Sequence, residues 1–251
     1  MVSFVSRDSI VRQIWGNADT ILFIFGGAAA EFSLNKAVDW LYFTGKLPAD
    51  PLGRLFSTVT YAQQIIFLEE QSALKAIDKI TAIHQNVEAS RGMKIPDWAY
   101  RDVLFMLIHY SISAFELLER KLSDAEKEEV FSVFLNVGKR MNLKDLPQKY
   151  QDWLIVREQY LQENLVRSTF TLDLYQQYKK HLGVIRYAIL LEGQKLVVPM
   201  LVKSLLDFNG ILLLKPFLKL YKIAKKISLH TALKSLLLPS NYKQQIAALD
   251  R

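Results

Sequence analysis

Residues 17–30 read NADTILFIFGGAAA, and this stretch decides the fold. Asn17 is a good helix cap, and the apolar run that follows from Thr20 is only about 11 residues long, short of the roughly 18–20 needed to cross a bilayer. We therefore expect a buried core helix that continues to about Phe43, where Gly45 and two prolines stop it. The small residues 26–30 leave room for a neighbouring helix or a flat ligand, and close helix packing is the commoner reason for such a patch.

Helical spacing of apolar residues continues along nearly the whole chain. The capping box of Ser123 and Glu126 opens one of these expected helices. Beyond residue 195, prolines and Gly210 interrupt the pattern, and we find no alternating strand and no internal repeat. The fold class is therefore all-α, a single domain over residues 1–251 with about eight to eleven helices. Besides the first, helices are expected at about 52–70, 72–90, 98–121, 123–141, 150–167 and 172–191.

Composition narrows the classes of function. The chain has 251 residues, 51% of them hydrophobic, which is enough for a sizeable core. It has no cysteine, which excludes disulfides, thiolate metal sites and a cysteine nucleophile. Its first residues show no basic segment followed by an apolar run, so we see no secretory signal and expect a cytoplasmic protein.

The positive charge gathers in one region. Of the formal net charge of +7, residues 195–251 carry +8, from ten Lys and Arg against two acidic residues. Lysines alternate there with leucine-rich stretches, which suits a basic amphipathic region at an anionic membrane surface; a helix packed on the domain with solvated lysines is the plainer alternative. Nucleic acid is not expected as a partner, because no stacking or base-reading module accompanies the lysines.

Four histidines limit the possible metal sites. His84 follows Ile77 and Ile80 and precedes Val87 at helical spacing, so its ring shares their inward-facing stripe. No pair of histidines shows metal-ligand spacing, and the HExxH pattern is absent, which argues against a zinc or di-iron site built from protein ligands alone. By residue chemistry alone, His84 is either a core histidine or a ligand.

Arg54 and Thr58 lie four residues apart, and so on one face of the expected helix at 52–70. Apolar neighbours such as Val59 suggest that this helix is largely buried. A buried guanidinium needs an anionic partner. A haem propionate or a bound oxygen species would serve, and so would one of three carboxylates, Asp50, Asp97 or Asp102.

Short motifs in order along the chain resemble the MpaB-type oxygenase family, which includes the latex clearing proteins, rubber oxygenases that contain haem b. Each motif is weak alone, but together they span nearly the whole chain. The matching motifs are IWG at residues 14–16, LFIFGG at 22–27, DPLGRL at 50–55 with Thr58, IHQNV at 83–87, PDW at 96–98, and SLLLP at 235–239 with Tyr242.

The resemblance implies a function and site residues. His84 falls at the position of the family's proximal haem ligand, so it would bind the iron of haem b and leave the opposite face open. Arg54 and Thr58 match residues near the haem, in contact with the porphyrin or the distal pocket. The implied protein is a haem-dependent oxygenase with a hydrophobic, lipid- or isoprenoid-like substrate.

The chain also departs from these relatives. It has Asn35–Lys36 in place of a His-Pro pair, Tyr100 in place of a histidine, and Ser57 in place of a lysine found in the rubber-cleaving members. Asp39 lies near the position of their catalytic glutamate and is assigned no role. The sequence therefore does not predict rubber cleavage, and a redox-neutral haem enzyme or a non-catalytic helical scaffold at a membrane surface stays open.

Overall fold

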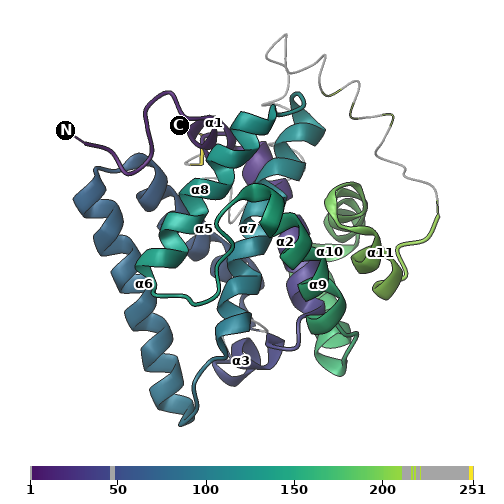
Figure 1. Ribbon diagram of the computed structural model, residues 1–251. Coiled ribbons are helices and arrows are strands. Elements are labelled where there is room, and N and C mark those ends of the chain that lie inside the picture. The colour runs from purple at the N-terminus through teal and green to yellow at the C-terminus, as the bar shows by residue number, and fades with distance from the viewer. Residues whose placement is uncertain are drawn as a thin grey trace.

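The structure is a computed structural model that describes residues 2–45, 49–210, 216, 218, 221, 249 and 250. Within these residues the chain forms ten α-helices and no β-strand, which confirms the all-α class (Figure 1). The helices are α1 (Ile10–Trp15), α2 (Ala18–Leu34), α3 (Val38–Phe43), α5 (Pro51–Phe67), α6 (Glu70–Arg91), α7 (Asp97–Leu118), α8 (Asp124–Arg140), α9 (Tyr150–Asn164), α10 (Thr169–Val197) and α11 (Met200–Leu205).

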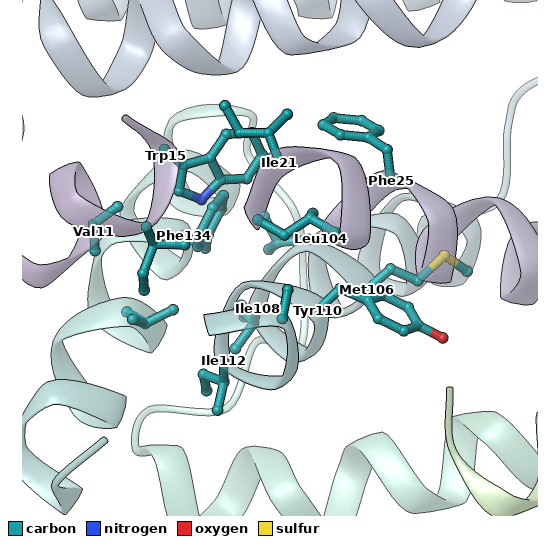
Figure 2. Close-up of a cluster of buried hydrophobic side chains, with 14 of the residues drawn as sticks. Val11, Trp15, Ile21, Phe25, Leu104, Met106, Ile108, Tyr110, Ile112 and Phe134 are labelled. Carbon is teal, nitrogen blue, oxygen red and sulfur yellow. The ribbon is translucent and has the colours of Figure 1, made fainter. Parts of the chain in front are cut away.

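Helices α2 and α7 form the centre of the molecule. They pack against each other more extensively than any other pair, and α10 covers a second side of α2 (Figure 1). Trp15, at the end of α1, is fully buried beside them, and its indole Nε1 donates to Ser111 Oγ of α7 over 3.1 Å. Figure 2 shows the apolar side chains that meet there. The apolar run of α2 is thus a core helix, as predicted, and none of the described helices has the length and apolarity that a bilayer crossing requires.

The prediction that this first helix continues to about Phe43 is wrong. Helix α2 ends at Leu34, and a separate short helix, α3, begins at Val38. The break lies at Asn35, whose side-chain oxygen accepts from the Ala37 backbone N–H over 2.8 Å and whose amide nitrogen donates to Asp102 of α7 over 2.7 Å. A side chain that bonds the local backbone in this way competes with the helical hydrogen bonds and ends the helix.

Glycines let α2 approach its neighbours closely. A methyl group added at Gly27 would lie 2.3 Å from ring carbons of Tyr110 on α7 and 3.0 Å from Val197 on α10. At Gly26 the nearest atom, on Leu190, would be 3.8 Å away, an ordinary contact. The small-residue patch in the sequence therefore serves close helix packing, and Gly27 is the position that requires it.

This difference predicts opposite effects of one added methyl group. Gly27→Ala should destabilise the protein by about 1–3 kcal/mol, because the Tyr110 ring must move within a packed core. Gly26→Ala, the matched control, should be neutral or slightly stabilising, since alanine favours helix by up to about 1 kcal/mol. Urea unfolding followed by circular dichroism measures both, and equal free energies of unfolding for the two variants would contradict the packing argument.

The basic region at residues 195–251 lies mostly outside the described residues. Its first part completes α10 and forms α11. Near its other end, the Leu249 carbonyl accepts from the Gln63 side chain over 2.9 Å, and the Asp250 carboxylate accepts from the Ala18 backbone N–H over 2.7 Å, at the N-terminus of α2. An acidic side chain there complements the positive end of the helix dipole.

Candidate functional site

His84 lies on α6, on the side of the helix that faces α7. Its side chain is half-buried and its Nδ1 atom is fully buried. Of the apolar stripe that the sequence predicts, Ile77 is fully buried, whereas Ile80 and Val87 are half-buried. The imidazole is therefore neither a deep core group nor a surface group.

Tyr100 of α7 holds one side of the imidazole. The two rings meet edge to face, with centroids 5.2 Å apart and planes at 88°. The Tyr100 hydroxyl donates to Glu88 Oε1 over 3.0 Å, and the same oxygen accepts from the Ile95 backbone N–H over 3.0 Å. Because Glu88 lies one turn beyond His84 on α6, this hydrogen bond fixes Tyr100 against the helix that carries the histidine.

Helices α5 and α6 form a hairpin, and Arg54 and His84 lie at similar distances along the chain from its link. They pack against each other and are joined by Leu68 and Glu69 alone, so they run in opposite directions. Arg54 and His84 lie 14 and 15 residues from this link, or about 21 and 22 Å along their helices at the α-helical rise. Asp50 opens α5 by accepting from the Gly53 backbone N–H over 2.8 Å.

The side chains of α5 agree only in part with the prediction of a largely buried helix. Val59 and Ile65 are buried, as expected, but Thr58 is exposed. The side chain of Arg54 lies outside the described part of the structure. Which anionic group pairs with it, a haem propionate, an oxygen species or a carboxylate, therefore stays a prediction. Thr58 sits one turn nearer the hairpin link than Arg54, on the same face of α5.

Asp39 pairs with Arg91 at the end of α6. Arg91 Nη2 donates to Asp39 Oδ2 over 2.7 Å, and the guanidinium lies over the Trp40 ring, 4.1 Å from its centroid. A cation that is paired and stacked in this way attaches α3 to α6. Asp39 thus has a structural partner.

A buried polar cluster crosses the core between α2, α7 and α9. Glu31 has no exposed surface, and its Oε2 atom accepts from Arg157 Nη2 over 2.5 Å and from the Tyr110 hydroxyl over 2.8 Å. The Arg157 side chain is 5% exposed. Burial and the Glu31 charge raise the pKa of the Tyr110 hydroxyl, which keeps it a proton donor. The cluster is an ion pair with one neutral donor in an apolar interior.

Asp102 extends this cluster along α7. Its Oδ2 atom accepts from the side-chain amides of Asn35, over 2.7 Å, and Asn164, over 3.0 Å. Burial nevertheless raises the pKa of Asp102 to about 6, against the opposing effects of the two amides and the Arg157 charge. Asp102 therefore takes up a proton in the folded protein at a pH where it would be ionised in the unfolded chain.

A pH dependence of stability follows. Because the pKa of Asp102 rises from 3.8 to about 6 on folding, its contribution is fully present below pH 3.8 and is lost as pH rises through about 6, up to about 3 kcal/mol in all. In Asp102→Asn, which stays neutral, the fall in the free energy of unfolding between pH 4.5 and 7.5 should be smaller than in the wild type by about 2 kcal/mol, the part of this contribution that is lost within that range. Urea titrations at the two pH values measure it, and parallel curves for the two proteins would contradict the assignment.

A model of a known protein family matches most of the chain. The family model described as "ER-bound oxygenase mpaB/B'/Rubber oxygenase, catalytic domain" matches residues 13–236. The chain belongs to this family. No curated protein and no solved structure matches it. The match to the MpaB and rubber oxygenase family runs from the end of α1 past α11, so it includes the α5–α6 hairpin and the buried cluster.

Two of the three positions at which the sequence analysis expects departures from the family, Asn35 and Tyr100, have structural contacts in this chain. Asn35 ends α2 and binds Asp102, and Tyr100 packs on His84. Ser57 is exposed beside Thr58. In the described part of the chain there is no group of three or more histidine, cysteine, aspartate or glutamate side chains that could hold a metal ion.

The sequence analysis missed the Glu31–Arg157 pair. The one available signal is the position of Glu31, a carboxylate directly after the apolar run of α2, where a core helix has no water to solvate it. Its partner lies 126 residues away on α9, a separation that no local pattern reveals.

Proposed function

We propose that the protein is a haem b-dependent oxygenase that acts on a hydrophobic, lipid- or isoprenoid-like small molecule. The membership of the oxygenase family supports the reaction class. The observation that supports the proposal is His84 on α6, a half-buried imidazole whose ring packs edge to face against Tyr100.

The residues at this place suit a haem. The Nδ1 atom of His84 is buried, so the ring would present Nε2 to an iron ion, and a neutral imidazole is a common axial ligand of haem. Arg54 is always charged and has the fork geometry that binds a carboxylate such as a propionate. Thr58 is exposed on the same face of α5, so its hydroxyl is accessible to a bound group.

Each residue then has a role. A bound haem supplies the iron that activates oxygen. His84 would hold the iron through a ring nitrogen, and Tyr100 limits rotation of that ring. Arg54 neutralises an anionic group of the porphyrin or polarises the pocket, and Thr58 offers a hydroxyl hydrogen bond there.

The visible absorption spectrum of the purified chain, before and after addition of haemin, tests the cofactor directly. We expect a Soret band that saturates at one haemin per chain, and a pyridine haemochrome assay to identify haem b. A spectrum equal to that of free haemin at every ratio contradicts the proposal and favours a non-catalytic helical scaffold. Oxygen consumption by the loaded protein with isoprenoid and fatty-acyl compounds then separates an oxygenase from a redox-neutral haem enzyme.

A further inference from the structure

Helix α10 contains a sharp bend at Gly183. This residue has φ 73° and ψ 171°, far from helical values, so Thr169–Val197 is in effect two helices joined at one point. Only glycine adopts this region of backbone space without strain.

The bend exposes two aliphatic side chains that directly follow Gly183. Val184 is 71% exposed and Ile185 is 76% exposed. Isolated exposed apolar residues are common, but two adjacent β-branched side chains with most of their surface in water form an apolar tip. Because Val184 and Ile185 stay mostly in water in the folded chain, they contribute little hydrophobic stabilisation to the fold.

Basic residues surround this apolar tip. Lys179, Lys180 and His181 are exposed on its N-terminal side, and Arg186 follows it. Neither lysine takes part in an ion pair within the described part of the chain. The nearest acidic residues in sequence, Asp173 and Glu192, are bonded to Tyr42 and Lys195. Residues 174–191 contain no acidic residue, so the tip is cationic.

We propose that residues 179–186, the α10 tip, dock on the surface of an anionic lipid bilayer. Val184 and Ile185 enter the boundary between headgroups and acyl chains, and the lysines remain at the level of the lipid phosphates. The pairing of apolar side chains with flanking cations matches this two-layered surface. A single-stranded nucleic acid would require aromatic side chains for stacking, and the exposed residues of the tip include none.

This surface is independent of haem binding and of the basic region at 195–251. It gives the described part of the protein its own contact with the phase in which a hydrophobic substrate would dissolve. The contact is expected to be weak and reversible, because two aliphatic side chains and a few cations act together rather than a long amphipathic helix.

Vesicle binding of the full chain tests the proposal. The chain should sediment with vesicles of phosphatidylcholine containing roughly one-third phosphatidylserine, and much less with phosphatidylcholine alone. Val184→Ser/Ile185→Ser should weaken the binding at least about tenfold, and Lys179→Gln/Lys180→Gln should weaken it about five- to tenfold with a reduced dependence on salt. Circular dichroism melting confirms that each variant is folded.

Helix α9 offers a matched control. Leu154 and Ile155 are another adjacent exposed aliphatic pair, 41% and 64% exposed, but they lie between Asp152 and Glu158. Leu154→Ser/Ile155→Ser should leave vesicle binding unchanged. Since the chain has no cysteine, Ile185→Cys and Ile155→Cys can each carry a single environment-sensitive fluorophore. Only the label at position 185 should brighten and shift to the blue with anionic vesicles.

Three results would overturn the proposal. The first is equal vesicle binding by the wild type and Val184→Ser/Ile185→Ser, which would place the contact elsewhere, for instance in the region 195–251. The second is the absence of binding by the wild type. The third is a wild-type dimer, seen by analytical ultracentrifugation, that the double serine variant abolishes while lipid binding is absent, which would make the tip a protein interface.

Discussion

Arg157→Met should destabilise the protein by about 3–5 kcal/mol, the largest effect that we expect of any single substitution. The substitution leaves Glu31 fully buried without its cation, while the Tyr110 hydroxyl still donates to its Oε2 atom. A buried carboxylate without its cation lowers the free energy of unfolding by far more than the intact ion pair raises it. Urea unfolding followed by circular dichroism measures the loss.

Two further variants separate the cost of a buried unpaired charge from the effect of losing an ion pair. In Glu31→Gln/Arg157→Met both charges are gone, so part of the lost stability should return relative to Arg157→Met alone. Arg140→Met removes a surface pair, Arg140 with Asp78, in which both side chains are nearly half-exposed, and should change the unfolding midpoint little. If Arg157→Met and Arg140→Met shift the midpoint equally, the buried pair does not have the importance that its geometry indicates.

The same substitution should act on Asp102. The Arg157 charge lowers the pKa of Asp102, against the larger effect of burial. Its removal should therefore raise that pKa further and move the pH dependence of stability upward. This coupling distinguishes a connected cluster from separate contacts.

His84→Ala should abolish specific haem binding, the second large effect. The substitution removes the only nitrogen that the proposal assigns to the iron, while the helix keeps a good helix former at a half-buried position. We expect the Soret band of the haemin complex to fall to that of free haemin. His181→Ala, at an exposed histidine on α10, is the matched control and should bind haemin as the wild type does.

A rescue experiment makes the test specific to ligation. In His84→Gly, imidazole added to the solution can occupy the vacated space and supply the missing nitrogen, so the Soret band should return in part. A structural role for His84 would give no such response. If His84→Ala instead binds haemin with a wild-type spectrum, another residue is the ligand and the site proposed here is wrong.

Much of the fold could be predicted because it depends on local chemistry. The capping box at Ser123 is present, with Glu126 bonded back to the Ser123 backbone N–H over 2.8 Å, and Asn17 caps α2 through the Thr20 N–H over 3.1 Å. Helices appear near all of the expected positions, and most ends differ by only a few residues, the early end of α2 at Leu34 being the main exception. Caps and apolar periodicity act within one or two turns, so the sequence carries them directly.

The candidate site could be predicted only in part. The sequence and its family resemblance singled out His84, Arg54 and Thr58, which lie on the neighbouring helices α5 and α6, and their roles stay a prediction. The sequence did not indicate that Thr58 is exposed, or that Tyr100 packs against the imidazole of His84. Such contacts depend on which helix lies opposite, and the spacing within one helix does not contain that information.

The sequence by itself determined that this protein is helical, that residues 20–30 form a core helix, and to which oxygenase family the chain belongs. Tertiary structure decided where that helix ends, because Asn35 bonds Asp102 on α7, and which charge neutralises Glu31, because α9 brings Arg157 beside it. The physical reason is common to both cases. A buried polar group must find its partner wherever the packing places one, and that partner can be far away along the chain.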